Sequence, residues 1–282
     1  MKSFIKTALI FSMLASFAFG TVRIMPMGDS ITYDYNYADK KNPRPDGLRK
    51  AYRAPLWYML EDADYPADFV GSLVAGQDVV PPFDPDNEGH PGWTSFDMAA
   101  RTYDFLSYSD PDIVLLHIGT NDRTTTSPDG VRQILDEMDR YERDTGHHIK
   151  AFVALIIDRK EHDSRIEIFN QRLKDMLIER IAQGDDIVIV DMYHDAGLTP
   201  SDYADNTHPN DKGYQKMAKV WFAALQAHPY DPNGTPPTLA ATIPVDEYPY
   251  VIVPKKYIRS IKVRGNTVTF ITEVPDNGIV FK

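Results

Sequence analysis

The chain has 282 residues, 43% of them hydrophobic, which suffices for one or two domains with a sizeable hydrophobic core. Its net charge of −11 argues against a nucleic-acid or anionic-membrane partner, because both are bound by basic surfaces. It contains no cysteine, which excludes disulfides, zinc-thiolate sites and cysteine catalysis.

Residues 1–20 have the pattern of a secretory signal peptide. Lys2 and Lys6 precede an apolar stretch, 8–19, and the small residues Ala18 and Gly20 occupy the −3 and −1 positions of a cleavage site. This stretch is too short for a comfortable membrane span, and no later stretch is long enough. We therefore predict a secreted protein cleaved near Gly20, which would bring its net charge to about −13.

The next segment places a serine at a strand-to-helix turn. A short apolar run, 22–27, is followed by Gly28-Asp29-Ser30-Ile31-Thr32, which predicts a strand, a tight turn and the start of a helix. Unpaired N–H groups and the helix dipole favour negative charge there, so an oxyanion formed beside Ser30 would be stabilised. The alternative is that Asp29 and Ser30 only cap the helix.

Two polar loops follow. The first carries Tyr33, Tyr35 and Tyr37, which either form a sugar-stacking rim beside the serine or cover the core. The second, 77–89, is predicted to be irregular. Its acidic residues favour a solvated loop over a calcium site, because the glycine and terminal glutamate of an EF-hand are missing.

The rest of the main domain alternates between strand and helix patterns. The runs 113–118, 151–157 and 187–190 are almost continuously apolar, as in strands buried on both faces of a parallel sheet. Amphipathic helical patterns separate them. We therefore predict an α/β fold with three layers around a doubly wound, mostly parallel sheet. Ligands bind beyond the carboxyl ends of such strands, where Ser30 and the segment 119–122 fall.

The composition changes after His228. Six prolines lie between 231 and 254, which predicts a linker over 229–255. A hairpin that turns at Gly265-Asn266 is expected within 256–282, and the segment 279–281 could add an edge strand. This short C-terminal β appendage is too small to fold alone. It is expected to pack on the main domain, with an export or anchoring signal as the alternative.

Several polar residues of the main domain, 21–228, together provide what ester hydrolysis needs. Ser30 can act as nucleophile and His208 as its base, with Asp205 close enough to hold the other imidazole nitrogen. The backbone N–H groups of Ser30 and Gly92 and the side-chain amide of Asn121 would supply three oxyanion donors.

A glycosidase offers a different interpretation of the carboxylates. Asp29 and Asp122 could then act as the acid–base pair. That interpretation leaves the serine, the asparagine and the Asp-x-x-His pair without roles, so we favour the esterase. His90 and His117 are expected to orient loops rather than to catalyse.

The order of these motifs resembles that of the SGNH, or GDSL-type, hydrolases. The matching blocks are Gly28-Asp29-Ser30, Gly92, Gly119-x-Asn121-Asp122 and Asp205-x-x-His208. A G-x-S-x-G motif, typical of ordinary α/β-hydrolases, is absent. Within the superfamily, the phrases 23–32, 52–53, 68–72, 88–93 and 115–122 resemble the acetylxylan esterases of carbohydrate esterase family 3.

The resemblance implies a flavodoxin-like SGNH fold and a serine esterase that removes acetyl groups from xylan or a related plant polysaccharide without a metal cofactor. Tyr33 and Trp93 are candidates for substrate binding, although Trp93 could equally pack against the sheet. We expect a monomer whose partner is the acetylated polysaccharide. The alternatives are a lipid-directed esterase or lysophospholipase of the same fold, and a non-catalytic carbohydrate-binding protein.

Overall fold

The computed structural model describes residues 20–231 throughout and, beyond them, five strands between 239 and 281. The predicted signal peptide, 1–20, lies outside the described residues except for Gly20. None of the described helices is long and apolar enough to cross a membrane.

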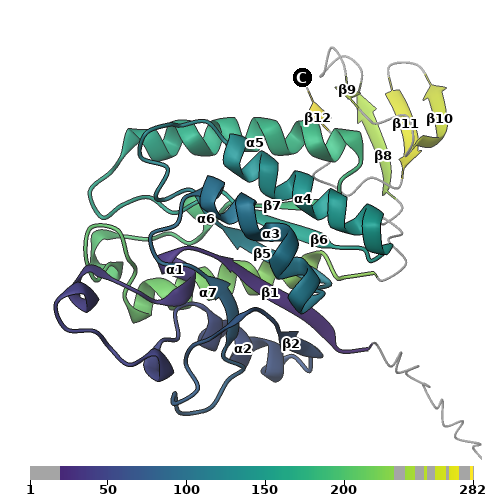
Figure 1. The fold of residues 1–282 in the computed structure, drawn as a ribbon. Helices are drawn as coiled ribbons and strands as arrows, with labels where there is room; N and C mark the ends of the chain where they lie inside the picture. Colours follow the sequence, from purple (N-terminus) through teal and green to yellow (C-terminus); the bar gives the residue numbers. More distant parts are fainter. Residues whose placement is uncertain are drawn as a thin grey trace, which may run out of the picture.

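A seven-stranded sheet forms the middle layer of the main domain (Figure 1). Its strands follow the order β3-β4-β1-β5-β6-β7, and β2 also pairs with β1. Every pair in it is parallel except β3 with β4. The strands are β1 (Val22–Gly28), β2 (Ala67–Phe69), β3 (Leu73–Val74), β4 (Asp86–Gly89), β5 (Ile113–His117), β6 (Lys150–Ala154) and β7 (Ile187–Val190).

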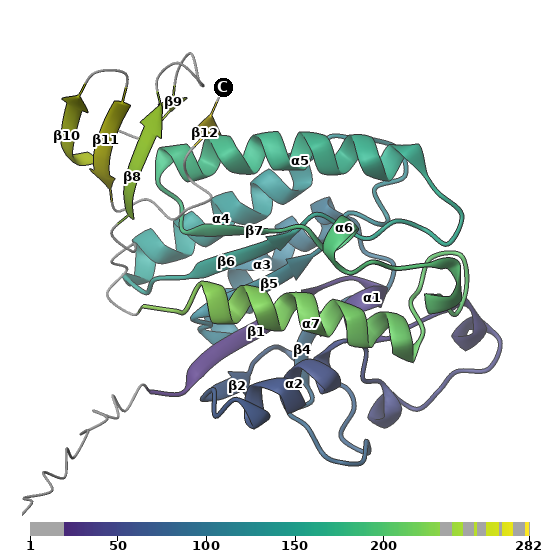
Figure 2. The ribbon, with the colours of Figure 1, turned by 180° about the vertical axis from the view of Figure 1, so that it is seen from behind.

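Helices cover both faces of this sheet (Figures 1 and 2). One face packs against α3 (Ser95–Ser109), α4 (Asp129–Thr145) and α5 (Ser164–Gln183). The other packs against α2 (Arg53–Asp62) and α7 (Asp211–Ala227). The short elements are α1 (Ser30–Tyr33), α6 (Met192–Asp195) and the 3-10 turns η1 (Tyr37–Lys40), η2 (Asp46–Leu48) and η3 (Pro200–Asp202). The predicted three-layer, doubly wound α/β fold is confirmed.

Successive strand side chains enter opposite cores, as the two-residue repeat of a strand requires. In β1, Met25 and Met27 pack with α3, α4 and α5, whereas Ile24 packs with α2 and α7. In β5, Val114 and Leu116 join the first core in the same way. Both faces are therefore apolar, which explains the continuous apolar runs in the sequence.

The prediction of an irregular, solvated loop over 77–89 is wrong at its end. Asp86–Gly89 forms β4, which pairs with β1 and β3. Glu88 is fully buried, and its carboxylate accepts hydrogen bonds from the Ser72 backbone N–H and hydroxyl, both at 2.8 Å. Internal donors thus replace water around this carboxylate. Within the described part of the chain, no group of acidic or histidine side chains is arranged to hold a metal ion.

The C-terminal strands form two small antiparallel sheets. β10 (Ile258–Arg264) pairs with β11 (Thr267–Thr272), as predicted for the hairpin around 265–266. β11 also pairs with β8 (Leu239–Pro244), and β12 (Val280–Phe281) pairs with β9 (Val251–Ile252) rather than with the hairpin. The range predicted as a linker, 229–255, thus contains β8 and β9, and Pro244 is the last residue of β8. The rest of the appendage lies outside the described residues.

Candidate active site

Ser30 is the first residue of α1, directly beyond the carboxyl end of β1. Asp29 caps this helix, because its Oδ1 accepts a hydrogen bond of 2.9 Å from the Ile31 N–H. Gly28 has no room for a side chain, since a Cβ there would lie 2.3 Å from the His117 carbonyl oxygen. Because Asp29 supplies the helix cap, the Ser30 hydroxyl is left for another partner.

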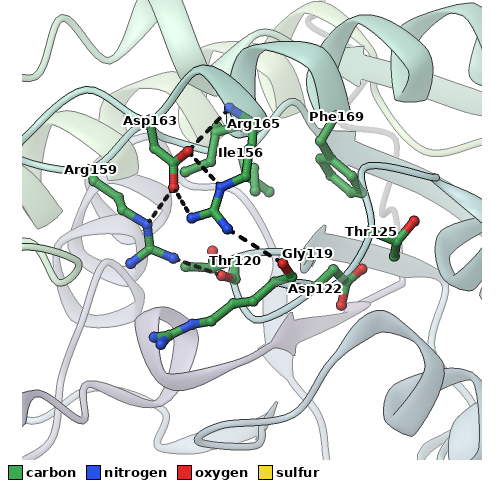
Figure 3. A pocket seen from close by; sticks show the side chains of 11 residues that line it. Gly119, Thr120, Asp122, Thr125, Ile156, Arg159, Asp163, Arg165 and Phe169 are labelled. Carbon is green, nitrogen blue, oxygen red and sulfur yellow. Dashed lines mark hydrogen bonds and ion pairs between the residues drawn. The ribbon is translucent and has the colours of Figure 1, made fainter.

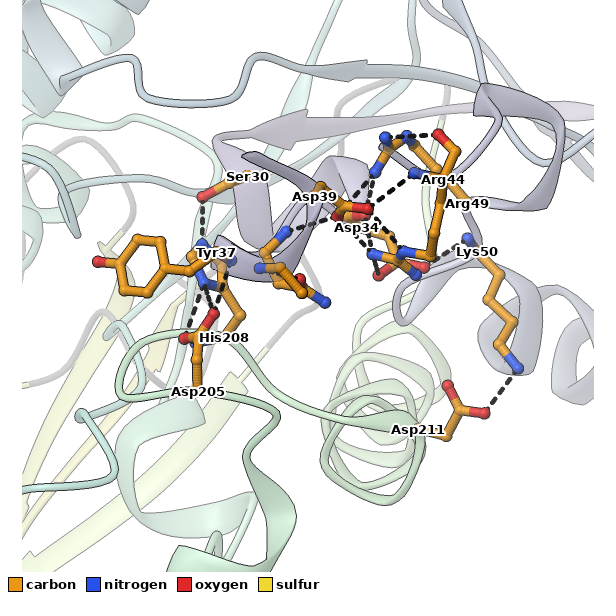
Figure 4. A network of polar contacts seen from close by, with 12 residues as sticks. Ser30, Asp34, Tyr37, Asp39, Arg44, Arg49, Lys50, Asp205, His208 and Asp211 are labelled. Atoms are coloured by element: carbon orange, nitrogen blue, oxygen red, sulfur yellow. Dashed lines mark hydrogen bonds and ion pairs between the residues drawn. The ribbon is translucent and has the colours of Figure 1, made fainter. Parts of the chain in front are cut away.

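That partner is His208, which lies 178 positions further along the chain. The Ser30 Oγ is 2.9 Å from His208 Nε2, and His208 Nδ1 is 2.9 Å from both carboxylate oxygens of Asp205 (Figure 4). The Ser30 and His208 residues are 6% and 4% exposed. With its proton on Nδ1, the imidazole donates to Asp205 and accepts from the serine, so the three side chains form one continuous chain of hydrogen bonds.

Asp205 is held by three backbone donors as well as by the imidazole. Its Oδ1 accepts from the N–H groups of Thr207 at 2.7 Å and of His208 at 2.8 Å, and its Oδ2 accepts from the Tyr37 N–H at 2.9 Å. Burial alone would raise the pKa of this carboxyl, but the hydrogen bonds outweigh it and hold the pKa below its ordinary value. Asp205 therefore stays ionised near neutral pH.

Tyr37 is the tyrosine that lies against the triad. Its ring meets the His208 ring edge-on, with centroids 5.1 Å apart, and its hydroxyl is 3.1 Å from Thr207 Oγ1. It starts η1, the turn that Asn36 caps. Farther along this loop, Asp39 forms ion pairs with Arg44 and Arg49, which fix the loop in place (Figure 4).

The two other predicted oxyanion donors lie on turns that are tied together. The Asn121 amide donates a hydrogen bond of 2.9 Å to the Trp93 carbonyl, and Trp93 directly follows Gly92. One N–H of the amide is thus used, and the second is left for a ligand. Gly92 has a φ of +86° and open space where a Cβ would stand, so its turn suits glycine and keeps the backbone bare.

The predicted substrate-binding residues differ in where they lie. The Arg49 guanidinium lies over the Tyr33 ring, with its carbon 5.4 Å from the ring centroid, so Tyr33 packs on Arg49 rather than on His208. Tyr35 approaches the same guanidinium at 5.2 Å. The Trp93 ring stacks on His90 at 3.9 Å and packs against the core, so its ring supports the Gly92 turn.

Asp29 and Asp122, the pair of the glycosidase interpretation, both serve helix starts. Asp122 accepts from the Ser95 backbone N–H at 2.9 Å and from the Ser95 hydroxyl at 2.5 Å, where α3 begins. Asp29 is fully buried, and burial raises the pKa of its carboxyl to about 6. Their contacts assign both carboxylates to positioning the turns that carry Ser30 and Asn121.

His117, which is buried, and His90, which is half-buried, each bond to a group other than Ser30 or Asp205. His117 accepts a hydrogen bond of 3.3 Å from the Ile157 N–H, and burial lowers its pKa to about 4, so it is neutral at pH 7. His90 lies 2.5 Å from the buried Glu88 carboxylate, through Nε2. Both positions agree with the expectation that these histidines orient loops.

Arg159 connects the two halves of the site, and sequence reasoning missed it. One of its terminal nitrogens donates to Thr207 Oγ1, beside His208, and the other donates to the Thr120 carbonyl at 3.0 Å, beside Asn121. Thr120 lies just beyond β5, 39 positions from Arg159, and Thr207 lies in the loop before α7, 48 positions away. No local motif could have indicated the connection.

Comparisons with known proteins give a consistent result. The model of the GDSL-like lipase/acylhydrolase family matches residues 27–216. A multidomain esterase from Ruminococcus flavefaciens is 28% identical in an alignment of 242 residues that covers 76% of this chain and 29% of that relative. The chain therefore spans less than a third of the relative's length.

Solved structures add a likeness in three dimensions. A family 3 carbohydrate esterase from Clostridium thermocellum is 26% identical with a TM-score of 0.61, over 73% of this chain and 95% of its own. A family 3 carbohydrate esterase from Talaromyces cellulolyticus is 28% identical with a TM-score of 0.60, over 73% of this chain and 96% of its own. An acetyl esterase mutant, solved with an acetate ion, is 28% identical with a TM-score of 0.59, over 73% of this chain and 96% of its own.

Proposed function

Because the chain belongs to the GDSL-like lipase/acylhydrolase family, we propose that it is a secreted serine esterase that removes O-acetyl groups from xylan or a related plant polysaccharide. The observation that carries the proposal is the hydrogen-bonded chain from Ser30 through His208 to Asp205, with 2.9 Å at each contact. The likeness to family 3 carbohydrate esterases and to an acetyl esterase supports the acetyl and polysaccharide parts of the proposal.

In the proposed reaction, the Ser30 oxygen attacks the acetyl carbonyl carbon while His208 Nε2 takes the serine proton. The resulting tetrahedral intermediate collapses, the bond to the sugar oxygen breaks, and His208 returns the proton to that oxygen. A water molecule, deprotonated by His208, then attacks the acetyl-serine; the bond to the Ser30 oxygen breaks, His208 returns the proton to that oxygen, and acetate leaves. The ionised Asp205 stabilises the imidazolium that forms in each step and fixes the tautomer with Nε2 free to accept.

The negative charge that develops on the carbonyl oxygen needs donors that are already in place. We assign this role to the backbone N–H groups of Ser30 and Gly92 and to the free N–H of the Asn121 amide. Such preorganised donors stabilise the transition state more than the substrate, and each typically changes kcat by about 10²–10³-fold. The hydrogen bond from Asn121 to the Trp93 carbonyl keeps two of these donors in register.

Acetate release from acetylated xylan tests the proposal, with the Ser30→Ala variant as the matched control. Release by the unmodified protein alone would support both the reaction and the substrate class. Serine-dependent cleavage of small acetyl esters without release from xylan would keep the esterase and reject the polysaccharide. Faster cleavage of long-chain esters than of acetyl esters would favour a lipid-directed esterase. Xylan binding without any ester cleavage would identify a carbohydrate-binding protein.

A further inference from the structure

A small pocket beside the triad is lined by three arginines. It lies beyond the carboxyl ends of β5 and β6 and includes the guanidinium groups of Arg123, Arg159 and Arg165. Figure 3 shows Arg159 and Arg165 on either side of Asp163, with Thr120 below them. This concentration of positive charge stands out in a chain whose net charge is −11.

The acidic residues of the lining leave part of this charge uncompensated. Asp163 pairs with Arg165 at 2.7 Å and with Arg159 at 3.4 Å. Asp122, the second carboxylate, receives both hydrogen bonds from Ser95. Arg123 is exposed and forms no ion pair with any residue that the structure describes. Of the two carboxylates only Asp163 pairs with arginines, namely Arg159 and Arg165, so Arg123 is the guanidinium left to meet an outside anion.

The pocket touches the proposed catalytic groups on two sides. Arg123 Nη2 donates to the Tyr37 hydroxyl at 3.3 Å, and the Tyr37 ring lies 5.1 Å from that of His208. On the other side, Thr120 and Asp122 belong to the lining and flank Asn121. A group bound at Arg123 would therefore be separated from His208 by the Tyr37 side chain, so it would belong to a part of the substrate beside the reacting ester.

We propose that this arginine pocket binds the carboxylate of a uronic acid carried by the polysaccharide near the acetylated sugar. The inference rests on the proposed function, because it names a feature of that substrate. A guanidinium group presents parallel donors that match the two oxygens of a carboxylate, which neutral sugars cannot match. Elsewhere the acidic surface repels such a polymer, so the pocket also selects the orientation in which it binds.

The test compares two polymers that differ only in charge. One is acetylated xylan with glucuronic acid substituents, and the other is the same xylan after its carboxyl groups have been reduced to alcohols. We expect a kcat/KM for the acidic polymer about twofold to fivefold higher, since this is the range that one exposed ion pair contributes at low salt. In Arg123→Gln the ratio should fall close to one, and Arg123→Lys should retain part of it.

Arg140→Gln is the matched control, because it removes the same charge from an exposed position near the far end of α4. It should keep the ratio of the unmodified protein. An unmodified protein that does not distinguish the polymers, or an Arg123→Gln variant that still does, would overturn the inference while leaving the esterase intact.

Failure to release acetate from either polymer would instead contradict the proposed function. Calorimetric binding by the Ser30→Ala variant then tests the pocket by itself. Tighter binding of a glucuronic acid-bearing xylo-oligosaccharide than of its reduced form would support the carboxylate site, and equal binding would refute it.

Discussion

The Tyr37 ring stands almost perpendicular to that of His208, at 88°, while the Tyr37 backbone N–H donates to Asp205. One residue of the loop after Ser30 thus contacts both other members of the proposed triad. This arrangement explains why the capped turn η1 and its arginine-braced loop belong to the site although they supply no reacting atom.

Two substitutions separate the ring of Tyr37 from its hydroxyl. Tyr37→Ala should lower kcat/KM by about tenfold or more, because the imidazole loses the ring that restrains it and misplaced catalytic groups are costly. Tyr37→Phe keeps the ring and should lose less. The measurement is steady-state hydrolysis of a small acetyl ester. Equal losses in the two variants would assign the effect to the hydroxyl network with Thr207 instead.

Removal of the proposed side-chain oxyanion donor should affect the chemical step. Asn121→Ala should lower kcat by about 10²–10³-fold with a much smaller change in KM, as for other oxyanion donors. It also frees the Trp93 carbonyl. Asn121→Asp keeps the side-chain size but replaces the N–H groups by an anion, and it should be at least as damaging. Wild-type kcat in either variant would exclude Asn121 from the oxyanion site.

The buried carboxyl of Asp29 predicts a pH-dependent change in stability. Its pKa is raised from 3.8 to about 6 in the folded protein, so between these values the folded state holds more protons than the unfolded state. Its contribution to stability is therefore complete below pH 4 and lost as the pH rises through 6. That loss amounts to at most about 3 kcal/mol.

Asp29→Asn tests this linkage, because asparagine caps helices as well as aspartate does but carries no charge. Relative to the unmodified protein, the variant should gain in free energy of unfolding as the pH rises from 4 to 7. Urea unfolding at several pH values measures the difference. A difference that is constant over this range would show that burial of Asp29 does not penalise its ionised form.

Arg53 offers a prediction about stability alone. It is fully buried and donates to the carbonyl oxygens of Thr32, Ala75, Pro85 and Arg49 at 2.9–3.0 Å. Arg53→Met fills similar space but leaves these acceptors unpaired, which should lower the free energy of unfolding by about 3 kcal/mol or more. The control is Arg132→Met, at a half-buried position on α4, which should change the free energy of unfolding by about 0.5 kcal/mol or less. If Arg53→Met and Arg132→Met unfolded at the same urea concentration, Arg53 would not have the stabilising role assigned to it.

The sequence predicts those parts of the fold whose signals are local. The runs 113–118 and 187–190 predict buried strands because both faces of the sheet are apolar, and Ser30 lies at a strand-to-helix turn, between β1 and α1, as its segment predicts. Each of these signals is confined to a few neighbouring residues.

Features that depend on distant partners could not be predicted in this way. Glu88 looked like a solvated acid because its donor, Ser72, lies 16 positions earlier. Tyr37 rather than Tyr33 lies beside His208 because of the path of the loop after Ser30, which the ion pairs of Asp39 with Arg44 and Arg49 fix. Arg159 was missed because its two partners belong to separate loops, one after β5 and one before α7.

The central claim is that Ser30 is the nucleophile that carries the acyl group, and covalent labelling tests it most directly. The protein is treated with diethyl 4-nitrophenyl phosphate, an inhibitor that phosphorylates activated serines, and its digest is examined by mass spectrometry. We predict a single diethylphosphoryl group on the peptide that contains Ser30, with loss of esterase activity in proportion, and no labelling of Ser30→Ala. Labelling at another residue, or esterase activity that survives in Ser30→Ala, would contradict the account.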